Sequence, residues 1–132
     1  MSKIKATIKK IDNFESLNVV SFDFFGVELK MMSLDLNKEM KVGTKVLLSI
    51  KPTSVAIAKN LNGMLSYSNQ IKSRIESMDM GRLLCSLKLS ACENLFESII
   101  TTASAKRMDL GIGDEVTALI KANEISIFEV IK

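Results

Sequence analysis

Polar and apolar residues alternate along several short stretches of the chain. Residues 3–9 read KIKATIK, and the same period of two returns at residues 19–24 and 83–89. Because successive side chains of a strand point to opposite faces, this pattern predicts strands with one buried face. Residues 95–101 predict a further strand. A basic membrane helix at residues 3–9 would need a period near 3.6, which the sequence lacks.

The chain also contains an internal repeat. Residues 43–57, GTKVLLSIKPTSVAI, align with residues 113–127, GDEVTALIKANEISI, at an offset of 70 with five of fifteen positions identical. Residues 4–8 align with residues 71–75 at an offset of 67, which places Asn69 on Ser2.

The repeat predicts two copies of one module, residues 1–58 and 66–132, joined by a linker over residues 59–65. A module of about 60 residues is marginally stable by itself. We therefore expect the modules to pair and the chain to form oligomers.

Each module is predicted to have one short helix after its third strand. Residues 102–111, TASAKRMDLG, start with a hydroxyl residue, are rich in alanine and end on glycine, which are helix start and stop signals. The corresponding segment of the first module is Ser33–Met40. The order strand, strand, strand, helix, strand, strand predicts a mainly β fold of two tandem OB-like five-stranded barrels, in which closure removes exposed sheet edges.

Composition limits the chemistry of these modules. The 132 residues include 18 Lys and Arg, 15 Asp and Glu and no His, for a net charge of +3. Without histidine there is no imidazole base, no Ser-His or Cys-His pair and no histidine metal ligand. Cys85 and Cys92 alone cannot complete a zinc or iron–sulfur site, and we predict both to be small core residues. We expect no enzyme activity, no catalytic residue and no bound metal cation.

Further features bear on location and partners. The eight methionines are interpreted as adaptable core residues rather than copper ligands. The first residues lack the apolar run of a signal peptide or membrane span, so we expect a cytoplasmic protein. Charges of both signs are mixed along the chain, which predicts no nucleic-acid and no membrane partner.

The second module resembles the molbindin domains of the Mop/TOBE family, whose members bind molybdate or tungstate. Three motifs carry the resemblance: SYSNQIKS at residues 66–73, ITTAS at 100–104 and GDEVTALIKAN at 113–123. The first module shares the layout but less of the motif, so the chain resembles a tandem, two-module molbindin. Tandem members of the family assemble as trimers, and their ions lie at contacts between modules, which implies a trimer with interface sites here.

The resemblance implies an oxyanion site that takes molybdate or tungstate as its ligand. The residues that match the family's site are Ser66, Tyr67, Ser68, Asn69, Thr101, Lys121, Ala122 and Asn123, with Lys51 and Ser104 as additional candidates. A tetrahedral dianion has only acceptor oxygens, so hydroxyls, amides, backbone N–H groups and a lysine are suitable partners.

Two departures from the family's pattern affect this expectation. Ser68 stands where the family often has Arg, and Asn123 stands where it has Ser. Loss of a guanidinium removes one positive charge and a forked donor. The first module has no counterpart of the Ser66–Asn69 segment, because Asn69 aligns with Ser2. We therefore expect fewer sites than modules.

Plainer interpretations of the same residues stay open. Lys121 fits an ordinary strand lysine, Ser66–Asn69 a polar linker end, and Thr101 or Ser104 a helix cap. The resemblance favours storage or buffering of the oxyanion. One alternative is an OB-type nucleic-acid-binding module, although aromatic residues make up only 5% of the chain and Tyr67 is the sole candidate stacking platform. The other is a regulatory or interaction module that has lost the ion site.

Overall fold

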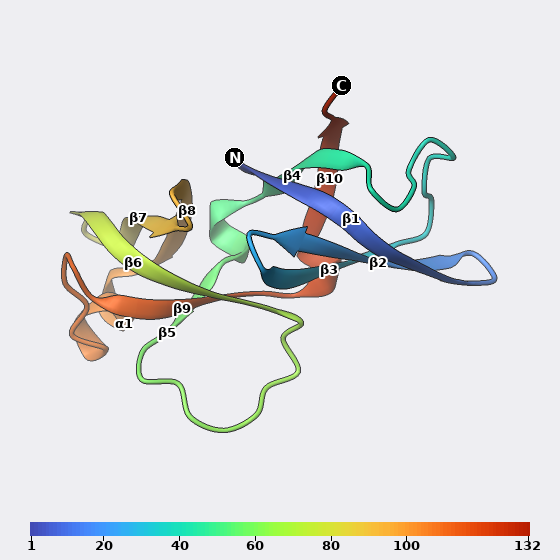
Figure 1. Cartoon of the computed structure of the whole chain (residues 1–132). Coiled ribbons are helices and arrows are strands. Elements are labelled where there is room, and N and C mark those ends of the chain that lie inside the picture. Colours follow the sequence, from blue (N-terminus) through green and yellow to red (C-terminus); the bar gives the residue numbers. More distant parts are fainter.

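Ten strands form two five-stranded sheets in the computed structural model, which describes residues 1–132 (Figure 1). The first sheet has the order β10-β4-β1-β2-β3 and the second has the order β5-β9-β6-β7-β8, with all neighbours antiparallel. The strands are β1 Ser2–Phe14, β2 Leu17–Phe24, β3 Val27–Ser33, β4 Lys45–Ile50, β5 Ala56–Ala58, β6 Asn69–Met80, β7 Leu84–Ala91, β8 Asn94–Thr101, β9 Glu115–Ile120 and β10 Ile125–Val130. The predicted mainly β fold with two five-stranded units is confirmed.

Each sheet takes its fifth strand from the other half of the chain. β10 follows β9 in the sequence, but it pairs with β4 of the first sheet. β5 follows β4, but it pairs with β9 of the second sheet. In Figure 1 the red β10 stands beside β4, far from the rest of the second half. The two halves therefore exchange their last strands.

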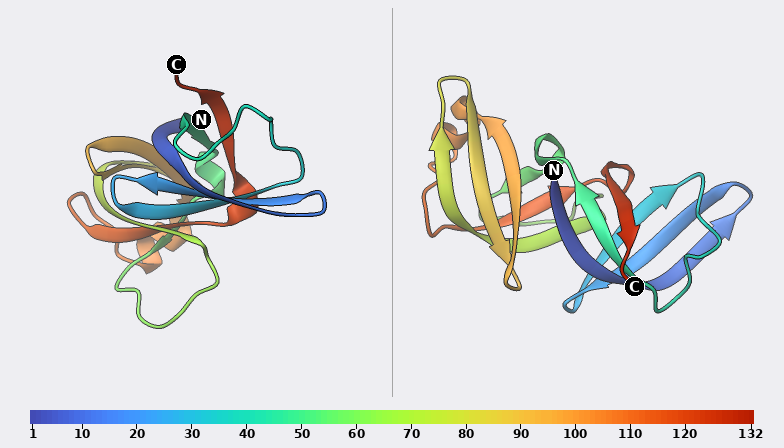
Figure 2. Two further views of the ribbon diagram at one scale, coloured as in Figure 1. Left: turned by 45° about the vertical axis from the view of Figure 1, so that its right-hand side comes forward. Right: turned by 90° about the horizontal axis from the view of Figure 1, so that it is seen from above.

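The exchange is symmetric at the repeat's offset of 70. Ser126 is opposite Ser49 in the first sheet, and the equivalent Ala56 is opposite Leu119 in the second. Both exchanged strands follow short 3₁₀ turns, η1 Pro52–Ser54 and η2 Ala122–Glu124. The two barrels consequently lie side by side, as seen from above in Figure 2.

The buried apolar side chains of both sheets form one connected cluster of 25 residues. Its members include residues of the alternating runs, such as Ile4, Ala6 and Ile8 of β1 and Ile71 and Ile75 of β6. The period of two in the sequence thus places one face of each strand in a shared core.

Only the second half contains a helix, so the helix predicted at Ser33–Met40 is wrong. Ser33 ends β3, its hydroxyl donates to the Asp35 carbonyl, and the Asn37 side chain accepts from the backbone N–H of Glu39. Such local side-chain bonds favour turns over helix. The first half therefore crosses from β3 to β4 as an irregular segment.

The helix of the second half, α1, spans Thr102–Arg107. It ends before the predicted stop at Gly111, because Asp109 adopts a left-handed conformation with φ of 50°. The N–H of Asp109 bonds to the Lys106 carbonyl and that of Leu110 to the Ala105 carbonyl. This is the Schellman pattern of helix termination, achieved here without glycine.

Two further expectations about the core need correction. Cys85 is buried as predicted, but Cys92 is exposed in the β7–β8 turn, where Cys92 and Glu93 have φ of 49° and 66°. A two-residue hairpin that needs positive φ at both positions faces solvent, whichever side chains occupy it. Several methionines are also on the surface rather than in the core, with Met64 99% exposed.

Strand exchange makes each half's stability depend on the other. Ile125 of β10 is 3% exposed and lies opposite Ile50 of β4. We predict that Ile125→Ala lowers the free energy of unfolding by about 2–5 kcal/mol, the usual cost of such a core truncation. Hydrogen exchange of β4 amides should accelerate with it, although β4 lies in the first half. The matched control is Ile71→Ala in the second sheet, and β4 amides no faster in Ile125→Ala than in this control would contradict the exchange.

Candidate functional site

The predicted site residues Lys51 and Lys121 occupy equivalent places in the fold. Lys51 follows β4 and precedes η1, whereas Lys121 follows β9 and precedes η2. Both side chains are exposed, and both residues have extended backbones. The two lysines therefore lie at the two points where the chain crosses from one sheet to the other.

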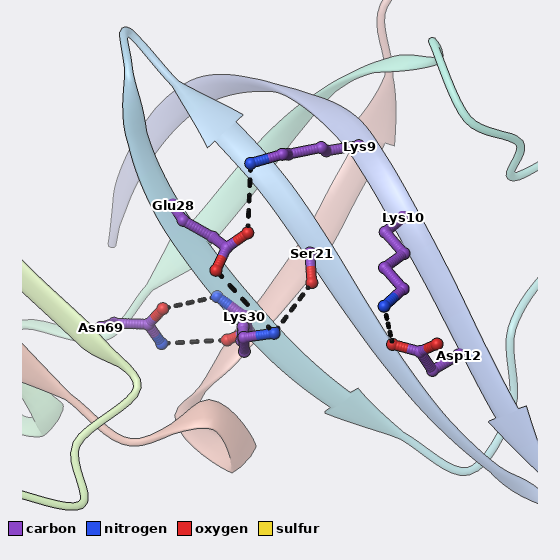
Figure 3. A network of polar contacts seen from close by, with 7 residues as sticks. All are labelled: Lys9, Lys10, Asp12, Ser21, Glu28, Lys30 and Asn69. Atoms are coloured by element: carbon purple, nitrogen blue, oxygen red, sulfur yellow. Dashed lines mark hydrogen bonds and ion pairs between the residues drawn. The ribbon is translucent and has the colours of Figure 1, made fainter.

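Asn69 is fully buried and joins the two sheets. Its Oδ1 accepts from the backbone N–H of Lys30 at 2.6 Å, and its Nδ2 donates to the Lys30 carbonyl at 2.9 Å (Figure 3). One amide thereby satisfies both backbone groups of a residue on β3, an edge strand. Asn69 of the second half thus holds β3 of the first sheet in place, and we call this pair of hydrogen bonds the Asn69 clamp.

A weaker contact occupies the symmetric position. Ser2 Oγ accepts from the backbone N–H of Glu97 on β8 at 2.9 Å. Ser2 and Glu97 correspond to Asn69 and Lys30 at an offset of 67. The same cross-sheet contact therefore exists twice, with two hydrogen bonds in one copy and one in the other.

The structure brings the Ser66–Asn69 segment close to Lys121. Asn69 is opposite Ile120 in the β6–β9 ladder, so Ser68 and Lys121 each lie one residue beyond the last pair. Ser66 and Ser68 are exposed, and Tyr67 is partly buried, with its carbonyl accepting from Gln70 Nε2. Ala122 is partly buried and Asn123 is exposed in η2.

Lys51 and Asn123 come together in a small pocket of about 220 Å³ at the crossing of the two halves. We call this the crossing pocket. Its lining residues are Met1, Ser49, Lys51, Ser54, Asn123, Glu124, Ile125 and Ser126. Ser49 Oγ also donates to the Met1 sulfur at 3.4 Å. Six of these eight side chains are polar or charged, so the pocket suits a small polar ligand.

Thr101 and Ser104 lie at the opposite end of the second sheet. Thr101 pairs with Leu84, near the β6–β7 turn, whereas Asn69 begins β6 at the far end. Thr101 Oγ1 accepts from the backbone N–H of Ser104 at 3.1 Å, which makes Thr101 the N-cap of α1. Within one chain, these two residues do not join the others.

Six of the eight lining residues of the crossing pocket were missed in the sequence, among them its three serines. Ser49 and Ser126 face each other across the β4–β10 pairing, and Ser54 ends η1. No motif links them, because β10 comes from the other half. The repeat gave no signal either, because at its offset of 70 Ser49 aligns with Leu119 and Ser126 aligns with Ala56.

Charges near the Asn69 clamp are already paired. Lys30 Nζ lies 3.1 Å from Ser21 Oγ and 3.9 Å from Glu28 Oε2, and Glu28 also receives Lys9 Nζ at 3.2 Å (Figure 3). The Lys30 ammonium is therefore engaged with Glu28, and it is the backbone of Lys30 that meets Asn69. Lys51 and Lys121 form no ion pair.

Two groups outside the crossing pocket have a pKa that differs from the ordinary value for their type. The backbone N–H of Gly111 holds the pKa of Asp114 below its ordinary value, and Lys59 adds to this, while partial desolvation opposes it. Burial raises the pKa of the Cys85 thiol, with the Asp79 carboxylate adding to the rise. Neither group lines the crossing pocket.

No group of three or more His, Cys, Asp or Glu side chains is arranged to hold a metal ion. No helix is long and apolar enough to span a membrane. The candidate chemistry of the crossing pocket therefore rests on hydroxyls, an amide and a lysine.

Comparison with known proteins identifies the second half of the chain. Residues 65–127 match the TOBE domain family. We call this half the TOBE domain, after the family that it matches. The match covers all predicted site residues except Lys51, and it includes the clamp residue Asn69. No curated protein matches the chain in sequence.

One solved structure shares the arrangement of nearly the whole chain. The cytoplasmic molybdate-binding protein ModG, in a crystal form with molybdate bound, aligns with a TM-score of 0.89 and 18% sequence identity, over 95% of this chain and 93% of its own. This match shows that the tandem fold is shared. A molybdate-binding protein from Sporomusa ovata aligns over 53% of this chain and its own full length, with 28% identity and a TM-score of 0.47.

The Asn69 clamp leads to a stability prediction. Asn69→Ala leaves the Lys30 N–H and C=O without their partner, and each such group costs about 1–3 kcal/mol when buried. We expect the free energy of unfolding to fall by about 2–6 kcal/mol in urea titrations. Asn69→Ser should recover part of the loss, whereas Ser2→Ala should cost less than Asn69→Ala. Equal costs at the two positions would show that Asn69 is not the dominant contact.

The Asp114 carboxylate leads to a prediction on pH. It accepts from the backbone N–H of Gly111 at 2.8 Å and lies 3.4 Å from Lys59 Nζ. Because its pKa is lowered in the folded state, its contribution is complete above the unfolded pKa and is lost as pH falls through the folded pKa. Asp114→Asn should lower the unfolding midpoint at pH 7, and the gap to the parent should close in strong acid. Asp35→Asn, at a side chain without hydrogen bonds, should show no such gap.

Proposed function

We propose that this protein binds the tetrahedral oxyanions molybdate or tungstate and stores or buffers them in the cytoplasm without catalysis. The TOBE domain and the tandem fold shared with ModG support the proposal. The crossing pocket supplies the residue types that such a dianion requires.

The crossing pocket is the observation that carries the proposal. Ser49, Ser54 and Ser126 offer hydroxyl donors, Asn123 an amide and Lys51 an ammonium. An oxyanion of charge −2 accepts hydrogen bonds only, and charge-assisted bonds are about twice as strong as neutral ones. Because Lys51 and Asn123 belong to different halves, the ion would lie at a contact between modules.

One lining residue opposes an anion. The Glu124 carboxylate is exposed on η2 and carries a negative charge at neutral pH. Its repulsion of a dianion is weakened by water but not abolished. Replacing Glu124 by a neutral residue should therefore strengthen anion binding, whereas replacing Lys51 by a neutral residue should weaken it.

The other candidate residues favour a site completed by further copies. Ser66, Ser68 and Lys121 are exposed at one end of the second sheet, and Thr101 is exposed at the other. Leu83 and Leu84, beside Thr101, are 77% and 56% exposed. A trimer that covers these leucines would bring Thr101 and Ser104 of one copy toward the Lys121 segment of another.

Calorimetric titration with molybdate, tungstate and sulfate at physiological salt tests the proposal. We expect molybdate or tungstate to bind at micromolar or lower Kd and sulfate to bind far more weakly. Lys51→Met should weaken binding at least about tenfold, the lower end for a lost charged hydrogen bond. Glu124→Gln should strengthen it, and Lys41→Met, at an exposed lysine outside the crossing pocket, should change nothing.

The oligomeric mass is measured with and without the ion. No heat and no thermal stabilisation by any oxyanion would contradict the proposed function. Binding that Lys51→Met leaves intact would contradict the assignment to the crossing pocket. A monomeric mass in the presence of bound ion would rule out the trimer but would leave the proposed function standing.

A further inference from the structure

A second and larger cavity adjoins the crossing pocket, with which it shares the lining residues Asn123, Ile125 and Ser126. It has a volume of about 580 Å³ between β3, the irregular segment 34–40 and β10. We call it the methionine groove, because Met31, Met32 and Met40 line it. Leu36, Phe128 and Val130 supply further apolar surface.

The groove lies beside the segment that stands in the place of the helix in the first half. In the TOBE domain, α1 follows β8 and places Ala105 in the core. Lys59, directly after β5, donates to the Met108 and Asp109 carbonyls at the end of α1. The helix thus bridges the strands β8 and β5.

The equivalent bridge is absent between β3 and β10. At the repeat's offset of 70, Glu129 stands where Lys59 stands in the TOBE domain. A carboxylate cannot donate to the carbonyls at a helix end. In the first half the irregular segment 34–40 lies there instead, with Leu36 and Met40 packed against the core and the groove beside them.

The groove exposes apolar surface of an adaptable kind. Met32 and Phe128 are 45% and 53% exposed, whereas Met31 is 4% exposed and forms the floor. Methionine has a flexible, polarisable side chain and is common on surfaces that accept varied apolar partners. Exposed apolar residues that line a concave surface indicate a binding site more than scattered ones do.

The border of the groove is acidic. Asp35, Glu39 and Glu129 are exposed lining residues, and none forms an ion pair. Lys132 is the only basic lining residue, although the whole chain has a net charge of +3. The groove therefore attracts positively charged partners, although the protein as a whole carries a net positive charge.

We propose that the methionine groove binds a short amphipathic helix of a partner protein, with apolar residues on one face and Lys or Arg on the other. The apolar face would cover Met32 and Phe128, and the basic residues would meet Asp35, Glu39 and Glu129. The TOBE domain shows the geometry, because α1 there is a short helix with Lys106 and Arg107 in its last turn. Helix-in-groove recognition has this combination of apolar anchors and charged borders.

Methyl NMR of the whole protein with ¹³C-methyl methionine tests the proposal. The probe is a synthetic peptide of about 14 residues with Leu on one helical face and Lys on the other. We expect saturable shifts at Met31, Met32 and Met40. Met64 and Met80, also exposed, report on non-specific contact and should not shift. A peptide of the same composition in scrambled order should bind at least about fivefold more weakly.

Matched variants test the role of the acidic border. Asp35→Asn with Glu39→Gln should weaken peptide binding at least about fivefold. Glu15→Gln with Glu93→Gln removes the same charge from two exposed turns outside the groove and should change affinity less than twofold. Equal effects of the two pairs would show only general charge attraction and would overturn the proposal.

Two other results would also overturn it. Shifts of Met64 and Met80 as large as those of Met32 would indicate non-specific binding. Concentration-dependent shifts of Met32 and Met40 without peptide would show that a second copy of this chain covers the groove. None of these outcomes depends on oxyanion binding, so the two proposals succeed or fail separately.

Discussion

The structure depends on the mutual pairing of β5 with β9 and of β10 with β4. Neither half can complete its sheet alone, because each gives its last strand away. The exchange turns two marginal modules into one body with a connected core. It also fixes the crossing pocket, since the crossings place Lys51 of one half beside Asn123 of the other.

The two copies have diverged within this symmetric frame. The second half keeps α1 and contributes the bidentate Asn69, whereas the first half has an irregular segment and contributes Ser2. The closed barrel end of the TOBE domain thus corresponds to an open groove in its neighbour. One chain thus carries two adjoining concave surfaces, one mainly polar and one that combines methionines and other apolar side chains with an acidic border.

The strands, the repeat and the helix at residue 102 were predictable, because a period of two and a capped, alanine-rich run are local signals. The helix at Ser33–Met40 was wrong, since side-chain bonds from Ser33 and Asn37 decide that segment. The candidate site residues were identified by resemblance to a family. Nothing in the sequence indicated that Thr101 and Ser104 lie at the opposite end of the second sheet from the others. Strand exchange depends on contacts between distant residues, so neither the partner of β10 nor the role of Ser49 follows from local pattern.

The position of β10 in the sequence has a consequence for synthesis. The first sheet needs residues 125–130 as its edge strand, so it cannot close while the ribosome is still making the second half. Domains usually fold in order as they emerge, N-terminal first. Here the nascent first half must wait with β4 unpaired on one side, and the first sheet is completed only after β10 has left the exit tunnel, although the second sheet already has all its strands.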